Sequence, residues 1–397
     1  MPDPVVTDLA EQVRTLAAAP EHLARRALWE SLHDLTPPRA LVSFTLYTGV
    51  WEREIAASGE IVHAPGVARD IEVQLRARLW KAAAIPDDEP LLPTVWLGMP
   101  RPADQGPLWG VDLPFNRPAE RGAYKPEPPL REEADLARIV APRYAEDTAS
   151  RDRLLADARE LIGDVLPVKL HTDELHYGPF EWAVRMRGMD ALLLDVYDRP
   201  YFAHALMERI TDGMVGYHRQ REAAGAVDAE ASWGFHMYWD RLAPGAGSRL
   251  RDCWAYAHAQ SSASFSPRMY AEFVQPYNVR IAELFGRVYY HGCEDLSARS
   301  AIIRDLPNLR MFHVGPWTPL EPVVRNLGGR CALEVHSHPT NVLFTFSNDD
   351  MRREIADLHR AAQGVPHVLK LCDVETLGGR AERLRAWTDA ARDVVEG

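Results

Sequence analysis

The feature that most constrains the fold of this chain is a repeated alternation of short apolar runs with helix-length segments. In the C-terminal half, residues 310–315, 331–336 and 367–372 are apolar enough to form strands buried on both faces. Buried strands that alternate with helices are typical of a parallel sheet. We place eight strand candidates along the chain, starting near residues 40, 94, 166, 231, 286, 309, 331 and 367.

Eight such units in 397 residues favour an α/β fold, a single (β/α)8 TIM barrel with an N-terminal helical extension. Apolar residues at helical spacing predict helices up to the two prolines that follow residue 36. We therefore expect the extension over residues 1–36 and the barrel over residues 37–397. A doubly wound open sheet is the alternative, but no Gly-x-Gly-x-x-Gly turn follows an early strand. Residues 100–130 are rich in Pro and Gly, which predicts an excursion that covers the surface or a pocket.

The overall charge and the cysteine content exclude several classes of protein. The net charge is −12, which argues against general binding to a nucleic-acid backbone. No signal-peptide pattern and no apolar run long enough for a bilayer are visible. Four cysteines are too few for a disulfide framework in a chain of this length. We therefore expect a cytoplasmic protein with reduced thiols, without a membrane or nucleic-acid partner.

Polar side chains collect where the predicted strands end. In a (β/α)8 barrel the catalytic groups lie at the C-terminal ends of the strands, so these side chains would converge on one mouth. Histidines scattered over a surface would not show this placement. The residues concerned are Tyr47, His171, Asp173, His236, Tyr238, Asp240, His291, Cys293, Glu294, His313, His336, His338, Cys372 and Asp373.

His291 and Cys293 form a partial metal site in the sequence. Residues two apart on a strand point to the same side, so an imidazole and a thiolate face one position and need a further ligand. Cys372 ends the last apolar run and is the candidate third ligand. The alternative is that these thiols are core residues, since free cysteine is among the most buried residue types. That alternative applies most strongly to Cys253 and to Cys331, which starts its strand.

The residues around this motif resemble those of a known family. The run 290–295, preceded by a Ser-Pro helix at residues 266–277, resembles the uroporphyrinogen decarboxylase superfamily, as do residues 179–188 and 369–387. The resemblance implies a (β/α)8 barrel with its site at the C-terminal mouth. The Gln-Ala-Gly-Arg element of the decarboxylase branch is absent, which argues against porphyrinogen decarboxylation. The His-x-Cys and distant Cys are more similar to the zinc methyltransferases that work with corrinoid proteins.

That branch implies a zinc ion bound by His291, Cys293 and Cys372. Glu294 stands where the family usually has glycine, and it is a possible fourth ligand. Three protein ligands leave an open position for a substrate nucleophile such as a thiol, bound as its anion. The resemblance implies that a methyl group moves between a small substrate and a corrinoid, methylcobalamin, carried by a partner protein. The candidates for orienting the substrate are His236, Tyr238, Asp173 and His338.

Two other functions remain open from the sequence. One is a decarboxylase or lyase that acts on a small carboxylic acid in the same barrel. The other is a barrel that binds a small molecule without catalysis. Asp173 and Asp240 are general acids or helix caps, and their spacing does not decide between these roles. A homodimer is the expected assembly only because dimers are the commonest oligomers.

Overall fold

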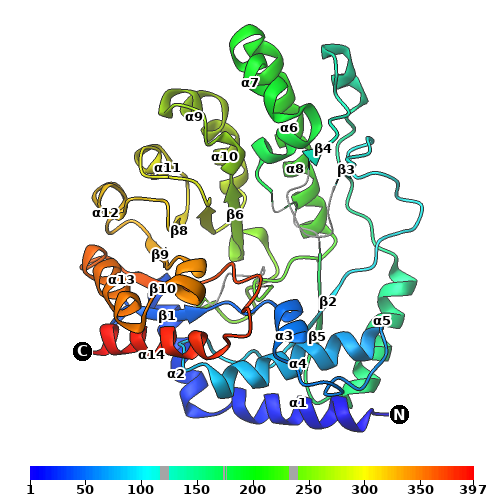
Figure 1. The fold of residues 1–397 in the computed structure, drawn as a ribbon. Helices are drawn as coiled ribbons and strands as arrows, with labels where there is room; N and C mark the ends of the chain where they lie inside the picture. The colour runs from blue at the N-terminus through cyan, green and yellow to red at the C-terminus, as the bar shows by residue number, and fades with distance from the viewer. Residues whose placement is uncertain (117–124, 173–174, 176, 232–239) are drawn as a thin grey trace.

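Parallel strands form the centre of this protein. The structure is a computed structural model that describes residues 1–116, 125–172, 175, 177–231 and 240–397 (Figure 1). Six strands form one parallel sheet in the order β1-β10-β9-β8-β7-β6, and β2 and β5 form a separate parallel pair. The bounds are β1 (Leu41–Phe44), β2 (Val95–Gly98), β5 (Val168–His171), β6 (Trp254–His258), β7 (Arg287–His291), β8 (Leu309–Val314), β9 (Ala332–His336) and β10 (His367–Leu371).

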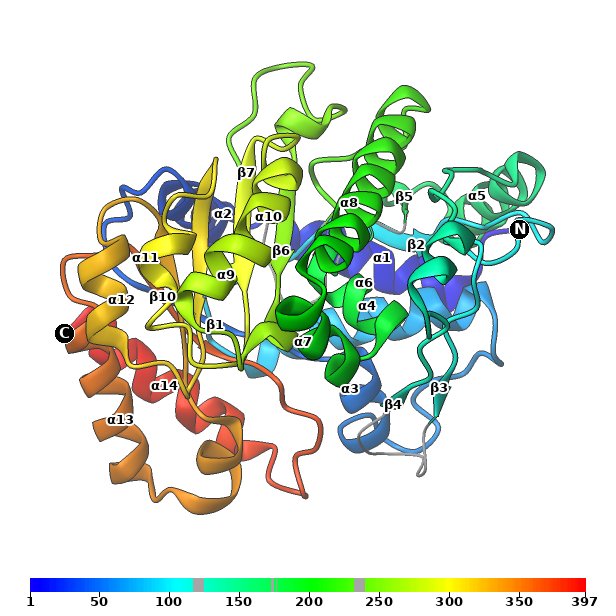
Figure 2. The same ribbon diagram turned by 90° about the horizontal axis from the view of Figure 1, so that it is seen from above.

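Helices connect the strands and cover the outside of the sheet (Figures 1 and 2). A short antiparallel pair, β3 (Phe115–Asn116) and β4 (Lys125–Pro126), lies within the predicted excursion at residues 100–130. The helices are α1 (Pro4–Ala17), α2 (Pro20–His33), α3 (Thr48–Glu54), α4 (Val67–Ala84), α5 (Thr148–Ile162), α6 (Pro179–Arg187), α7 (Met189–Asp198), α8 (Pro200–Ala223), α9 (Pro267–Phe273), α10 (Gln275–Ala282), α11 (Ser300–Ile303), α12 (Leu320–Leu327), α13 (Asn348–Ala361) and α14 (Glu382–Glu396). No described helix is both long and apolar enough to cross a membrane.

The inner face of the six-stranded sheet changes from apolar to polar along the strands. At the strand starts, an apolar cluster forms from Leu41, Trp254, Tyr289, Met311, Ala332 and Val368. Trp29 and Leu32 of α2 complete this cluster, so α2 closes the N-terminal end of the strands. Because side chains on one face recur every second residue, the next positions on the same face are Ser43, Tyr256, His291, His313, Glu334 and Lys370.

The predicted N-terminal helical region is confirmed as two helices, α1 and α2. Each has a proline in its first turn, where the missing N–H costs no helix hydrogen bond. Seven of the eight predicted strand starts lie within two residues of an observed strand. The eighth, near residue 231, falls largely on residues 232–239, outside the described residues.

The strand β6 was missing from the prediction. It reads Trp-Ala-Tyr-Ala-His, and its small residues Ala255 and Ala257 gave no apolar run. The strand is instead recognised from its tertiary contacts. Gly178 packs so closely against it that no side chain would fit at position 178. A Cβ atom at Gly178 would lie 2.0 Å from the carbonyl oxygen of His258.

The parallel α/β architecture is as predicted, but the described strands do not pair into one closed sheet. The free edge of β1 binds carboxylates of a loop instead of the edge of β2. Val42 N donates to Asp88 Oδ2 at 2.8 Å, and Phe44 N donates to Asp87 Oδ2 at 3.0 Å. The backbone donors of this edge are therefore satisfied without a neighbouring strand.

Candidate functional site

The C-terminal ends of the six-stranded sheet bring four histidines side by side. His258, His291, His313 and His336 come from the adjacent strands β6, β7, β8 and β9. Neighbouring ring centroids are 5.4, 4.3 and 4.2 Å apart along this row. All four imidazoles are buried. The strand-end positions that the sequence singled out for β7, β8 and β9 thus meet at one place.

Two groups of these residues have donor atoms close enough to hold a metal ion. In the first, one ligand atom each of His291, Cys293 and His313 lies within 4.8 Å of the others. In the second, His313, Glu334 and His336 meet the same criterion. His291 and Cys293 are therefore together as predicted, with His313 as their nearest common partner.

The imidazole of His291 is held through its Nδ1 atom. Tyr256 Oη lies 2.8 Å from this nitrogen, and His258 Nδ1 lies 3.3 Å from it. The other ring nitrogen, Nε2, lies 3.9 Å from Cys293 Sγ. His291 therefore presents Nε2 on the side of the thiol.

The carboxylate of Glu334 is the centre of a buried polar cluster behind His313. Tyr289 O–H donates to its Oε1 atom at 2.7 Å, and His336 Nε2 lies 2.7 Å from the same oxygen. Lys370 Nζ donates to Oε2 at 2.9 Å. Burial by itself raises the pKa of the Glu334 carboxyl, but Lys370 and the two histidines hold it well below its usual range. Glu334 is therefore a carboxylate inside the sheet.

Burial disfavours the charged forms of Cys293 and His313. Burial raises the pKa of the Cys293 thiol to about 12, with Asp373 and Glu294 as further causes. Burial, followed by the neighbouring imidazole of His336, lowers the pKa of His313 to about 4. The thiol and the imidazole are therefore both neutral near pH 7.

Cys372 lies beside this group rather than within it. Its Sγ atom is 3.7 Å from Tyr47 Oη and 3.8 Å from Asp373 Oδ1. Burial raises the pKa of the Cys372 thiol to about 12, and Asp373 is the next cause, as it is for Cys293. The two thiols thus share one carboxylate neighbour, and the role of Cys372 as a metal ligand stays a prediction.

The other predicted site residues have different surroundings. Glu294 pairs with Arg299 at 3.2 Å and belongs to neither donor group, so its role as fourth ligand also stays a prediction. His338 packs edge-on against Trp317, with ring centroids 4.9 Å apart. The remaining predicted catalytic residues, Asp173, His236 and Tyr238, lie outside the described residues.

Asp240 corrects one prediction, because it lies at the opposite end of the strands. Its carboxylate is 3.3 Å from His33 Nδ1 of α2 and accepts from Trp254 Nε1 at 2.7 Å. It also lies 3.3 Å from Arg287 Nε at the start of β7. Asp240 therefore joins α2 to the sheet. The prediction failed because it assigned residues 231–236 as the strand and thus took Asp240 for a strand end.

The first donor group fits a zinc ion by its own chemistry. One thiol and two imidazoles are common zinc ligands. Within the part of the chain that the structure describes, the Nε2 atom of His313 is buried without a hydrogen-bond partner. The glycine at position 315 leaves room beside it, since a Cβ atom there would lie 3.0 Å from this nitrogen. A buried nitrogen without a hydrogen-bond partner in a group of zinc-type ligands is the arrangement expected of a metal ligand.

A cleft of about 1000 Å³ opens beside this group of residues. It reaches the row of histidines at His258, whose Nε2 atom lies 3.9 Å from Glu181 Oε1. Arg185 lies in the same cleft, with its guanidinium 3.6 Å from the centre of the Tyr177 ring. The cleft is large enough for a small substrate. Its lining residues are Pro128, Arg131, Tyr177, Glu181, Val184, Arg185, Arg187, Gly188, Met189, Asp190, Ala191, His258, Gln260 and Ser261.

The sequence prediction missed His258, Tyr256, Tyr289, Glu334 and Lys370. The first two lie on the strand that was not predicted. The other three lie inside predicted strands. Each stands two positions before the strand-end residue on which the prediction concentrated, namely His291, His336 or Cys372. The signal that could have found these three residues is a charged or phenolic side chain inside an otherwise apolar run.

Comparison with known proteins gives a likeness of fold. No protein-family model matches this chain, and a search of curated proteins finds no match. Among solved structures, a methyltransferase from Methanosarcina mazei matches with a TM-score of 0.56 and 13% sequence identity. The match covers 93% of this chain and 98% of that protein. Nearly the whole chain is therefore similar in fold to that methyltransferase.

Proposed function

We propose that this protein is a zinc-dependent methyltransferase or demethylase that moves a methyl group between a small substrate and a corrinoid. The observation that carries the proposal is the group formed by His291, Cys293 and His313 at the C-terminal ends of neighbouring strands. The similarity in fold to a methyltransferase over nearly the whole chain supports it. The motif that resembles the uroporphyrinogen decarboxylase superfamily provides two of the three residues.

We also propose that the eight parallel strands belong to one (β/α)8 barrel. The apolar cluster at the strand starts and the polar groups at the strand ends are the arrangement of a barrel with a closed base and an active mouth. The pair β2 and β5 would complete this barrel beside β1 and β6.

The metal would be held by His291 and Cys293, with His313 or Cys372 as the third ligand. Bound there, zinc would supply a positive charge that lowers the pKa of a thiol or similar nucleophile. The chain's own residues prepare this position. Tyr256 holds the ring of His291, and the cleft beside His258 gives a substrate access to the same place.

The corrinoid would arrive on a partner protein. The sequence contains no apparent module for binding cobalamin, and the cleft offers one open side for the substrate. Direct exchange between a small nucleophile and a bound carrier requires both to approach Cys293 and its neighbours. Glu181 and His258 are placed to contact the substrate at the wall of the cleft.

The metal content of the purified protein tests this proposal. After supply of zinc, we expect about one zinc per chain by elemental analysis, lost in Cys293→Ser. Cys253→Ala is the matched control, because that buried thiol donates to Arg249 O near the start of β6. Separate Cys372→Ala and His313→Gln variants identify the third ligand.

The activity assay uses methylcobalamin and a small thiol with the same variants. We expect methyl transfer by the wild type and by Cys253→Ala, with none by Cys293→Ser. A wild-type protein that binds no zinc would contradict the proposal. Decarboxylation of a small acid that survives in Cys293→Ser would favour the lyase alternative.

A further inference from the structure

Glu334 lies next to His313, one of the proposed metal ligands, and its position bears on how that ligand is held. Its carboxylate belongs to the second donor group and not to the first, and it lies beside His313 on the next strand. His313 Nδ1 lies 3.3 Å from Tyr289 Oη and 3.6 Å from Glu334 Oε1. The question is which of the two nitrogens of His313 carries the proton.

The hydrogen bonds answer this question step by step. Glu334 accepts from the ammonium group of Lys370 at 2.9 Å and is therefore a carboxylate, which only accepts hydrogen bonds. Tyr289 has a single hydroxyl hydrogen, which it donates to Glu334 at 2.7 Å. The oxygen of Tyr289 can therefore only accept from His313, which requires the hydrogen on Nδ1. Neutral His313 then has a lone pair on Nε2, the buried nitrogen without a partner.

Lys370 fixes which groups donate and which accept in this chain of hydrogen bonds. Its ammonium group donates to Glu334 Oε2 at 2.9 Å and has no accepting atom. It thereby holds the carboxylate in its charged form and binds one of its two oxygens. The other oxygen receives Tyr289 and His336.

We propose that Glu334 is a positioning residue that acts through Tyr289 to hold His313 as the Nδ1–H tautomer, with Nε2 ready to bind the metal. This inference rests on the proposed metal site. It assigns Glu334 to the support of a ligand rather than to coordination. The alternative is that the metal binds to His313, Glu334 and His336, the second donor group.

The first test measures the His313 tautomer directly in the metal-free protein. Nitrogen NMR of ¹⁵N-histidine-labelled protein distinguishes the two tautomers, and His313→Gln identifies the signal. We expect Nδ1–H in the wild type. In Glu334→Gln, the amide oxygen turns to Lys370 and its NH₂ group donates to Tyr289. The hydroxyl of Tyr289 then donates to His313 Nδ1, so we expect the Nε2–H tautomer.

The matched control is Glu89→Gln. Glu89 is another carboxylate close to Lys370, and it accepts from Ser43 Oγ at 2.6 Å without contacting His313. We expect this variant to keep the wild-type tautomer. A second variant, Tyr289→Phe, breaks the chain of hydrogen bonds without changing the Glu334–Lys370 pair, in case Glu334→Gln does not fold. Its control is Tyr290→Phe, which removes a hydroxyl that contacts Tyr270 instead.

The second test measures zinc affinity by competition with a chelator. Loss of a residue that orients a metal ligand typically weakens binding 10-fold to 100-fold, and we expect this range for Glu334→Gln and Tyr289→Phe. Both controls should keep the wild-type affinity. Unchanged tautomer and affinity in both variants, with zinc still bound, would overturn the inference and leave the proposed function intact.

The remaining outcomes separate the two proposals. Complete loss of zinc in Glu334→Gln with an unchanged His313 tautomer would make Glu334 a ligand and overturn the positioning role. A wild-type protein without zinc affinity would overturn the proposed function. The tautomer measurement would still decide how Glu334 acts on His313.

Discussion

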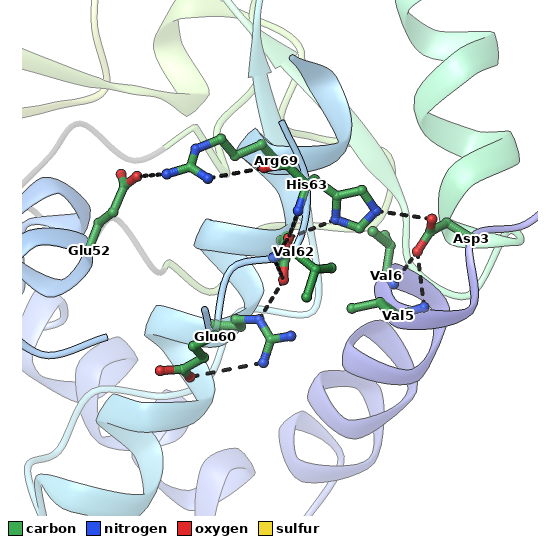
Figure 3. Close-up of polar contacts among 10 residues, drawn as sticks. Asp3, Val5, Val6, Glu52, Glu60, Val62, His63 and Arg69 are labelled. Atoms are coloured by element: carbon green, nitrogen blue, oxygen red, sulfur yellow. Dashed lines mark hydrogen bonds and ion pairs between the residues drawn. The ribbon is translucent and has the colours of Figure 1, made fainter. Parts of the chain in front are cut away.

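Two histidines that contact carboxylates have pKa shifts in opposite directions in this protein. His313 lies beside Glu334 within the sheet, and its pKa is lowered to about 4, chiefly by burial. His63 lies between Asp3 and Glu72 at the contact of α1 with α4 (Figure 3). Hydrogen bonds to Asp3 and then to Glu72 raise the pKa of His63.

The difference follows from the cost of burial. The His313 side chain is only 1% exposed, and the negative charge of Glu334 beside it is matched by Lys370. The His63 side chain is 18% exposed and contacts two carboxylates. Each carboxylate favours the imidazolium form, but the burial of His313 outweighs its contact with Glu334. Inside the sheet, burial therefore keeps the imidazole neutral, as a metal ligand must be.

The largest expected effect comes from removal of the charge that matches Glu334. Lys370→Met leaves a buried carboxylate without its cation, and we expect unfolding free energy to fall by about 3–5 kcal/mol. Arg76→Ala is the corresponding change at the other site, where Arg76 Nε binds Glu72 at 2.8 Å. Because Glu72 keeps His63 and two backbone donors, we expect about 1 kcal/mol or less there. Equal losses in urea denaturation would contradict the comparison.

A smaller effect is expected at Asp3, which combines two roles. Its carboxylate accepts from Val5 N and Val6 N at the start of α1 and also contacts His63 (Figure 3). Asp3→Ala removes both interactions, and we expect a loss of about 1 kcal/mol, as for other helix caps. Asp3→Asn keeps the cap and should lose less. Denaturation of both variants measures the difference, and an equal loss would show that the charge on Asp3, rather than the cap, stabilises α1.

The smallest effect is the share of the pH dependence of stability that comes from His63, and His313 acts in the opposite direction. The raised pKa of His63 gives stability that is present below about pH 6.5 and lost as pH rises through the folded value. The lowered pKa of His313 gives stability that is present above about pH 6.5 and lost as pH falls toward about 4. NMR titration of the histidine rings measures both values. His63→Gln should differ from the wild type mainly below neutral pH, and a constant difference from pH 5 to 9 would refute this.

Much of the fold could be predicted from the sequence because burial on both faces leaves a local pattern. The runs that became β7, β8, β9 and β10 are rich in apolar residues, and helices separate them. β6 lacks that pattern, since two of its five residues, Ala255 and Ala257, are alanines. Its place depends on the close approach of residue Gly178, which lies 76 or more positions earlier in the chain than the strand.

For the candidate site, too, only the arrangement of residues close in sequence could be predicted. His291 and Cys293 are neighbours in sequence, so their common direction follows from strand geometry alone. The partners of these residues come from other strands, and no spacing rule relates them. His313 and Glu334 are brought together by the register of β8 against β9, where they are direct partners.

The amino-acid sequence alone determined the alternation of strands and helices, the two N-terminal helices and the pairing of His291 with Cys293. These depend on interactions within a few residues, which composition and period encode directly. Tertiary structure decided that His313 joins them, that Asp240 lies at the opposite end, and that Glu334 is held by Lys370 and Tyr289. Such contacts join residues far apart in the chain, and only the register of neighbouring strands determines which polar groups must satisfy one another in the absence of water.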